Sequence, residues 1–296
     1  MPDFEPFERV LLTIEYDGSA FYGWQRQARL RSVQEELERA LARATGRETT
    51  VWGASRTDAG VNATGQRAHF HNYSTIPAEK FPFVLNTMLP PDVRVTAARV
   101  VPEWLHARFS CRGKIYTYRI HNARHASAIR RNWTTHIPVP VDEGRMQAAA
   151  LRLLGTHDFG AFQASGGTAK STVRTLYDIS VTREGDDITI VVAGSAFLYN
   201  MVRILAGTLV AIGQDRLSPD ALDEALATQN RLLLGVTAPA SGLELTRIFY
   251  DLDGERPEKW SVNDKYIGDF PVDESGGGYI SKAKKRRPGI RRAALA

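Results

Sequence analysis

The order of strand-like and helix-like segments over the first hundred residues restricts the fold more than any other feature of the chain. Residues 10–16 alternate between two faces, which is the period of a half-buried strand. Ser32 and Glu35 have the spacing of a capping box, and apolar residues recur at helical spacing from there to Gly46. The later predicted segments are a strand just before Asp58, a strand at 67–71, a helix from Pro77 to Pro90 and a strand at 93–101. This β-α-β-β-α-β order predicts a ferredoxin-like unit.

The second half of the chain shows a similar alternation of predicted strands and helices, but less clearly. Its predicted segments are a strand at 114–120, a helix at 142–154, a hairpin of strands 173–181 and 188–193, a helix at about 198–212, a helix beginning at Ser218-Pro219 and a strand at 243–249. A chain of 296 residues lies near the length at which one core divides into two. We therefore predict an α+β fold of two tandem ferredoxin-like (RRM-like) lobes, residues 1–106 and 107–251, with a catalytic cleft between them.

Composition points to a protein of the cytoplasm whose basic charge is unevenly distributed. One cysteine, Cys111, excludes an internal disulfide, the N-terminus does not resemble a signal peptide, and the longest apolar run, 204–213, is too short to span a membrane. The net charge is +5, but seven Lys and Arg residues lie in 281–296, and removing them leaves residues 1–280 at −2. We interpret residues 252–296, glycine-rich and then basic, as a flexible tail.

The common cofactor and metal motifs are missing from the sequence. It contains no Gly-x-Gly-x-x-Gly after a strand, no P-loop and no His-Glu-x-x-His. His69 and His71, and likewise His121 and His125, would suit a metal only if a further ligand converged on them. Isolated histidines are more often structural, so we expect neither a metal nor a cofactor.

Residues 54–61 contain the acidic residue with the greatest catalytic interest. Asp58 lies two positions after Arg56 and before Gly60, where a strand gives way to a loop. One interpretation is an ordinary surface turn in which Asp58 accepts a backbone hydrogen bond. The other is a catalytic loop, because chemistry concentrates in loops held by a rigid scaffold. The stretch alone favours the turn.

Two stretches combine aromatic and basic side chains, a combination that suits RNA. Residues 21–31 include Arg26 and Arg29 beside three aromatic rings, and could hold phosphates and stack bases; their aromatics could equally pack in the core. Residues 106–118 include Arg108, and strand alternation places Tyr116 and Tyr118 on one face.

Arg203 interrupts an apolar helix, so its charge must reach solvent or meet an anion. Asp58 is a candidate for that anion.

Seven short motifs in this order resemble the tRNA pseudouridine synthases of the TruA family. The resemblance extends from about residue 9 to residue 250. The motifs are Tyr16-Asp17-Gly18, Gly23-Trp24-Gln25, Ser32-Val33-Gln34, Arg56-Thr57-Asp58-Ala59-Gly60-Val61, Ala107-Arg108-Phe109-Ser110, Val173-Arg174-Thr175 and Met201-Val202-Arg203.

The resemblance implies a cofactor-free isomerisation of uridine at positions 38, 39 and 40 of the tRNA anticodon arm, catalysed by a homodimer. Asp58 matches the catalytic nucleophile, Tyr116 the tyrosine that stacks on the target base and could remove its C5 proton, and Arg203 the arginine paired with the aspartate. Arg56, Arg26, Arg29 and Arg108 are then expected to contact RNA. Whether Asp58 attacks the sugar, attacks the base or abstracts a sugar proton stays open.

Two positions depart from the pattern that the resemblance implies. The family usually has glycine before Arg56 and histidine after Val61, where this chain has Ser55 and Asn62. Neither carries one of the three catalytic roles, so we expect changed RNA contacts rather than lost activity. A non-enzymatic RNA-binding protein is the alternative, because it would need the basic aromatic surface but not Asp58.

Overall fold

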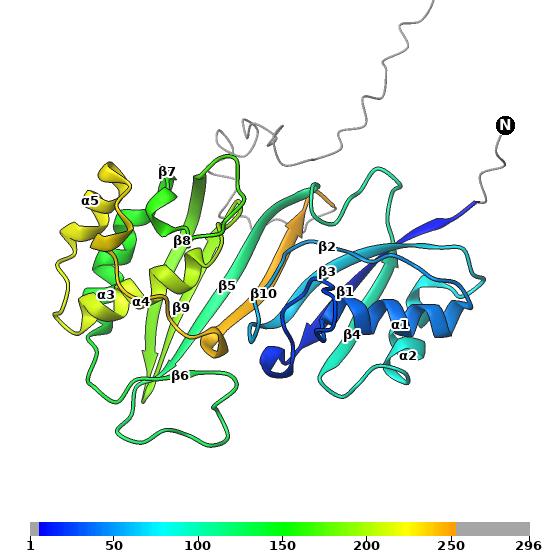
Figure 1. Cartoon of the computed structure of the whole chain (residues 1–296), viewed down its shortest axis with the longest axis horizontal. Coiled ribbons are helices and arrows are strands. Elements are labelled where there is room, and N and C mark those ends of the chain that lie inside the picture. Colours follow the sequence, from blue (N-terminus) through cyan, green and yellow to red (C-terminus); the bar gives the residue numbers. More distant parts are fainter. Residues whose placement is uncertain (1–5, 253–296) are drawn as a thin grey trace, which may run out of the picture.

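The computed structural model describes residues 6–252, which form one ten-stranded mixed sheet and five α-helices (Figure 1). The predicted tail lies outside the described residues. The strands are β1 (Glu8–Tyr16), β2 (Trp52–Gly53), β3 (Asn62–Asn72), β4 (Val93–Val100), β5 (Cys111–His121), β6 (Thr135–His136), β7 (Gly155–Asp158), β8 (Val173–Glu184), β9 (Asp187–Gly194) and β10 (Leu243–Tyr250). The helices are α1 (Val33–Thr45), α2 (Phe81–Asn86), α3 (Glu143–Ala150), α4 (Met201–Gly213) and α5 (Asp220–Thr228). The mixed α+β class predicted from the sequence is therefore correct.

The N-terminal half contains β1 to β4 and the helices α1 and α2. In the sheet, β1 lies between β4 and β3 and is antiparallel to both, and β2 pairs with β3. Helix α1 begins as predicted, because the Ser32 hydroxyl accepts a hydrogen bond from the Glu35 amide, and it ends at Gly46 in the left-handed conformation. The Glu35 carboxylate pairs with Arg39 instead of reaching back to the cap.

The helix predicted from Pro77 to Pro90 is much shorter in the structure. A 3₁₀ turn at Ala78–Lys80 precedes α2, and α2 ends at Asn86. The Asn86 side chain exchanges two hydrogen bonds with the Val95 backbone, which ties the helix end to β4 before the prolines are reached. The prolines therefore follow the helix rather than stop it.

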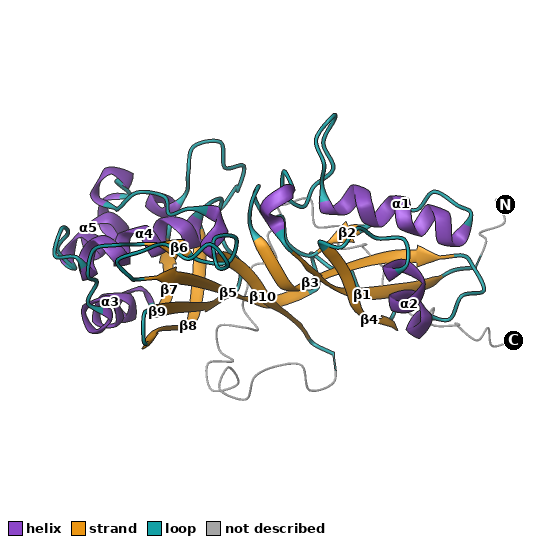
Figure 2. Cartoon of the chain, turned by 90° about the horizontal axis from the view of Figure 1, so that it is seen from below, coloured by secondary structure: helices purple, strands orange, loops and turns teal. Residues whose placement is uncertain are grey.

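The C-terminal half contains the antiparallel series β5, β9, β8 and β7, with α3, α4 and α5 (Figure 2). The predicted hairpin is present as β8 and β9. Helix α4 begins at Met201, three residues later than predicted, because Asn200 has a left-handed φ of 60° that no helix interior adopts. Strands β6 and β7, two and four residues long, were not predicted, because such short segments show no clear period.

Strand β10 joins the two halves into one continuous sheet. It is parallel to β3 on one side and antiparallel to β5 on the other (Figures 1 and 2). The approach to β3 is close at Gly65, where a Cβ atom would lie 2.0 Å from the Thr246 carbonyl oxygen, so only glycine fits. The predicted boundary at 106/107 lies in the loop between β4 and β5, and the strands on both sides of it belong to the same sheet. Within residues 6–252, every helix is too short or too polar to cross a bilayer.

Candidate active site

The loop carrying Asp58 is held to its neighbours by paired hydrogen bonds. The Ser55 backbone exchanges two with the buried Gln66 side chain: the Ser55 amide donates to Oε1 at 3.2 Å, and Nε2 donates to the Ser55 carbonyl at 2.7 Å. The hydroxyls of Tyr16 and Thr57 lie 2.8 Å apart. The residues on both sides of Arg56, Ser55 through its backbone and Thr57 through its hydroxyl, are therefore held by side chains of the sheet.

Two glycines allow other segments to approach the Asp58 loop. A Cβ at Gly18 would lie 2.1 Å from the Val61 carbonyl oxygen. Gly23 has a φ of 92°, and a Cβ there would lie 2.5 Å from the Thr57 carbonyl oxygen, which accepts a hydrogen bond from the Trp24 amide. The motifs Tyr16-Asp17-Gly18 and Gly23-Trp24-Gln25 thus serve as the scaffold of the loop.

Arg203, in the first turn of α4, is the cation nearest to the Asp58 carboxylate. Its Nη1 lies 3.6 Å from Asp58 Oδ2, an ion pair longer than a hydrogen bond. Shorter bonds hold the guanidinium: Nε donates to the Ala238 carbonyl at 2.7 Å and Nη1 to Asn200 Oδ1 at 2.8 Å. The Asp58 side chain is 29% exposed, so a substrate can reach it.

Burial raises the pKa of the Asp58 carboxyl above its ordinary value, and the positive charge of Arg203 opposes the increase without cancelling it. A half-buried carboxylate beside a single cation is less well solvated than one in water. That combination suits a nucleophile or a base more than a structural ion pair does.

Tyr116 extends from β5 toward the same loop. Its hydroxyl lies 3.0 Å from Ser55 Oγ, its ring packs edge-on against Phe197 at a centroid distance of 5.1 Å, and it is 6% exposed. Burial is the main cause that raises the pKa of Tyr116, and the charge of Asp58 adds to it. The resting side chain is therefore the neutral phenol. The structure thus places Asp58, Arg203 and Tyr116 around one loop.

The four other arginines predicted as RNA contacts are all exposed. Arg56 lies in the Asp58 loop. Arg26 pairs with Glu38 at 3.2 Å, and Arg29 lies in the turn that precedes α1, with a φ of 65°. The Arg108 guanidinium lies 5.6 Å from the centre of the Phe109 ring.

The aromatic stretch 21–31 serves mainly the core. Phe21 and Trp24 are each 3% exposed, and a Cβ at Gly53 would lie 2.3 Å from the Trp24 indole. Tyr22, by contrast, is 56% exposed. The interpretation as core packing is therefore correct for two of the three rings, and Tyr22 is the ring that a ligand could reach.

Three of the four histidines considered as metal ligands have protein partners, and the fourth, His125, is exposed. His69 Nδ1 accepts from the Ala107 amide, and burial is the main cause that lowers its pKa to about 3. His71 Nε2 lies 2.9 Å from Arg9 Nη2, and His121 pairs with Asp187. Within the described part of the chain, no three His, Cys, Asp or Glu side chains gather as possible metal ligands.

Asn62, where the family usually has histidine, joins three segments. Its Oδ1 accepts from the Gly18 amide at 2.8 Å, and its Nδ2 donates to the carbonyls of Asn132 at 2.7 Å and Ser241 at 3.2 Å. Asn132 lies in the loop between β5 and β6, so Asn62 links both halves of the chain below the Asp58 loop. The departure thus has a structural use.

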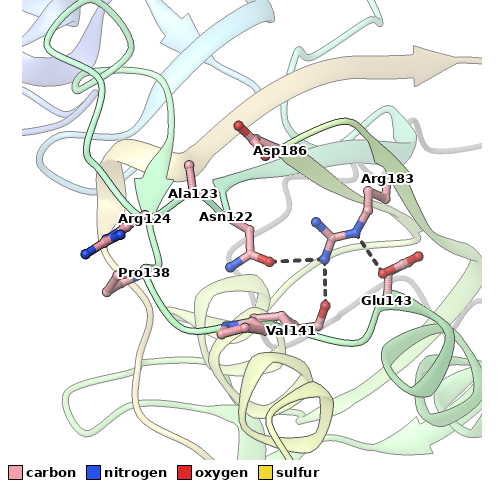
Figure 3. Close-up of a pocket in the computed structure, with 9 residues that line it drawn as sticks. Asn122, Ala123, Arg124, Pro138, Val141, Glu143, Arg183 and Asp186 are labelled. Atoms are coloured by element: carbon pink, nitrogen blue, oxygen red, sulfur yellow. Dashed lines mark hydrogen bonds and ion pairs between the residues drawn. The ribbon is translucent and has the colours of Figure 1, made fainter.

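A cleft of about 560 Å³ lies elsewhere, among the β5–β6 connection, the segment before α3 and the end of β8 (Figure 3). Arg183 forms part of its wall and donates to Glu143 at 2.8 Å, Asn122 at 3.1 Å and the Val141 carbonyl at 2.6 Å. The guanidinium is thus engaged within the wall, and none of the residues around Asp58 lines this cleft. It is not the candidate site.

Three supporting residues, Gln66, Lys114 and Asn200, were not assigned roles from the sequence. Gln66 holds Ser55, Lys114 Nζ donates to the Ala54 carbonyl at 3.0 Å, and Asn200 holds Arg203. The sequence signal for Lys114 was present, because it lies two residues before Tyr116 and so on the same face of the strand. Gln66 and Asn200 carry no comparable signal.

This chain is similar to known proteins over most of its length. Residues 12–110 and 149–251 match the family model for tRNA pseudouridine synthases. The chain is 46% identical over 243 residues to tRNA pseudouridine synthase A of Ruminiclostridium cellulolyticum, covering 82% of this chain and 99% of the relative. It is 44% identical over 241 residues to tRNA pseudouridine synthase A of Acetivibrio thermocellus, covering 81% and 99%. The chain therefore belongs to the tRNA pseudouridine synthase family, a family of isomerases.

Proposed function

We propose that the protein converts uridine to pseudouridine at positions 38, 39 and 40 in the anticodon arm of tRNA, with Asp58 as the nucleophile. The observation that carries the proposal is the reachable Asp58 carboxylate, 3.6 Å from Arg203 and on a loop whose Ser55 bonds to Tyr116. The names of the relatives support tRNA as the substrate.

The reaction rearranges one nucleotide and needs no cofactor. The N1–C1′ bond breaks, the base rotates, C5 bonds to C1′, the C5 proton leaves and N1 takes up a proton. Arg203 keeps Asp58 ionised and oriented, while the hydrogen bonds from its own Nε and Nη1 to Ala238 and Asn200 fix the guanidinium. Arg203 therefore forms no bidentate ion pair with Asp58, and the carboxylate oxygens are available to the substrate.

Tyr116 has the role of stacking on the target base. A base in a stem must leave its stack before an enzyme reaches it, which costs a few kcal/mol. Stacking on an aromatic ring returns about 1–3 kcal/mol of that cost. In this assignment Tyr116 also takes up the C5 proton.

The proposal also covers the RNA contacts, the two lobes, the tail, the oligomeric state and the location of the protein. Exposed Arg56, Arg26, Arg29 and Arg108 supply contacts to phosphates. Residues 1–106 and 107–251 act as two ferredoxin-like lobes whose shared sheet supports the site, residues 252–296 form a basic tail, and the enzyme works as a homodimer in the cytoplasm. The strand order β4-β1-β3-β2 of the N-terminal half supports the first lobe.

The test is pseudouridine mapping on tRNA treated with wild type, Asp58→Asn and the control Asp186→Asn. Asp186 is an exposed carboxylate in the β8–β9 turn. We expect pseudouridine at the three positions with wild type and with the control, and none with Asp58→Asn. Full modification by Asp58→Asn would remove the nucleophile assignment. A wild type that binds tRNA and forms no pseudouridine would favour the RNA-binding alternative.

A further inference from the structure

Ser55 and Lys114 form a hydrogen-bonded chain behind the Tyr116 hydroxyl. Ser55 Oγ lies 3.0 Å from the Tyr116 hydroxyl oxygen and 3.1 Å from Lys114 Nζ. Where the family usually has glycine, this chain therefore has a hydroxyl that links the tyrosine to the lysine.

The three groups are fixed by the surrounding structure. The Gln66 side chain holds the Ser55 backbone with two hydrogen bonds, and the Ala54 carbonyl accepts from Lys114 Nζ. Lys114 and Tyr116 lie two residues apart on β5, whose register with β9 is regular from Lys114 to His121. Both side chains therefore project from one face of the strand toward Ser55.

The surroundings disfavour the charged forms of both Lys114 and Tyr116. Burial is the main cause that lowers the pKa of Lys114, and the positive charges of Arg108 and Arg174 act in the same direction, against Cys111. A neutral amine has a lone pair that can accept a proton. Tyr116 is held as the phenol by burial, so by itself it is a poor base and needs a group that takes its proton.

We propose that Tyr116, Ser55 and Lys114 form a proton relay that takes up the C5 proton of the target uridine, with Lys114 as the final acceptor. The proposal rests on the function proposed above. Tyr116 touches the base, whereas Ser55 and Lys114 act through it.

The relay balances as one step. The electrons of the C5–H bond form the C5–C6 double bond, and the C5 proton passes to the Tyr116 oxygen. The electron pair of the C6–N1 double bond moves onto N1, which takes a proton from water. The hydroxyl proton of Tyr116 moves to Ser55 Oγ, and the hydroxyl proton of Ser55 moves to the lone pair of Lys114. Lys114 leaves the step as an ammonium ion and later returns its proton to water.

Single-turnover kinetics on tRNA carrying either hydrogen or deuterium at the C5 of uridine test the relay. The variants are Ser55→Ala and Lys114→Met, which break it, and Ser55→Thr, which keeps a hydroxyl. Thr117→Val is the matched control: its hydroxyl lies on the opposite face of β5 and bonds to Thr246 at 2.7 Å. Thermal unfolding of each variant checks that it is folded, and a binding titration gives its affinity for tRNA.

We expect Ser55→Ala and Lys114→Met to slow pseudouridine formation by roughly 10- to 100-fold. Both should show a larger isotope effect than wild type, because loss of the C5 proton becomes the slow step. Ser55→Ala should bind tRNA as wild type does, Ser55→Thr should recover most of the rate, and Thr117→Val should behave as wild type.

A Ser55→Ala enzyme with the wild-type rate and isotope effect would overturn the relay. A slower Ser55→Ala enzyme with an unchanged isotope effect would overturn it too, since Ser55 would then only support the loop. A wild type that forms no pseudouridine would instead remove the proposed function, and the relay with it, before any variant is compared.

Discussion

Two half-buried arginines of this molecule meet carboxylates in opposite ways. Arg31 donates to both oxygens of Asp92 at 2.6 and 2.9 Å and to Glu36 at 2.8 Å. Its guanidinium also lies 4.1 Å from the centre of the Phe21 ring. Arg203 donates its short hydrogen bonds to the Ala238 carbonyl and to Asn200 Oδ1. Its Nη1 lies 3.6 Å from Asp58 Oδ2.

The difference separates a structural ion pair from one suited to chemistry. Arg31 occupies both oxygens of its carboxylate, and these bonds raise the pKa of Arg31, so the pair is locked. The positive charge of Arg203 lies near Asp58, but Arg203 makes no short hydrogen bond to either carboxylate oxygen. The pKa of Asp58 stays above its ordinary value. An arginine held by uncharged oxygens can therefore bias a carboxylate while leaving it free to react.

Among variants that keep Asp58, the largest effect is expected from Arg203→Met. Removing the nearest cation should slow pseudouridine formation roughly 100-fold or more, because the reacting carboxylate loses its preorganised charge partner. Asp58 must be ionised to react, so activity falls as the pH falls through its pKa. Since Arg203 lowers that pKa, the acidic limb of the rate profile should move to higher pH in the variant. Single-turnover rates across pH measure the loss of rate and the position of the acidic limb. An acidic limb at the wild-type pH would contradict the role given to Arg203.

The matched variant Arg31→Met should affect stability instead. Asp92 and Glu36 lose their charged hydrogen bonds, so the free energy of unfolding should fall by about 1–3 kcal/mol in urea titrations. The rate per folded molecule should stay at the wild-type value. A loss of rate as large as that of Arg203→Met would erase the distinction between the two arginines.

A smaller effect is expected from Asn200→Gly, which keeps the left-handed backbone and removes the amide that holds Arg203 Nη1. One hydrogen bond is worth about 0.5–1.5 kcal/mol, so the rate should fall by about three- to tenfold. Single-turnover assays of wild type, Asn200→Gly and Arg203→Met measure how much each variant slows pseudouridine formation. An Asn200→Gly enzyme as slow as Arg203→Met would show that the orientation of Arg203, and not its charge, controls the site.

The smallest effect is a gain in stability from Asp58→Asn at neutral pH. Because the pKa of Asp58 is raised on folding, this group stabilises the fold most below its unfolded pKa, and that stability is lost as the pH rises through the folded pKa. At neutral pH the ionised group therefore opposes folding, and asparagine removes the cost. Thermal unfolding at neutral pH should show a slightly higher Tm, and a lower one would mean that the attraction of Arg203 exceeds the burial cost.

Local patterns in the sequence were enough to predict most of the elements. The alternation before Asp17, the cap at Ser32 and the turn between β8 and β9 each depend on neighbours within a few residues. The end of α2 could not be predicted in the same way, because Asn86 is bonded to the next strand. The place of β10 between β3 and β5 was likewise beyond local patterns, since strand pairing over such separations leaves no periodic signal.

The candidate site was predicted in part, and mainly through resemblance. The motifs contain Asp58 and Arg203, and the resemblance assigned Tyr116 by position; the catalytic roles of all three stay predictions. Composition could not distinguish Trp24, buried against Gly53, from Tyr22, which is exposed, because the two differ only in the direction of their side chains. The contact of Ser55 with Tyr116 depends on how β5 lies over the loop, which no spacing within either stretch encodes.

Strand β10 is the last described strand to be synthesised and one of the central strands of the sheet. When the ribosome has completed Arg203, the three residues assigned to the chemistry already exist, but the strand that joins β3 to β5 does not. Until residues 243–250 emerge, both halves present an unpaired strand edge where β10 belongs, the kind of surface that invites wrong pairing. The two halves can therefore form one sheet only after β10 has emerged, so we expect a chain that ends before residue 243 to be both inactive and prone to aggregate.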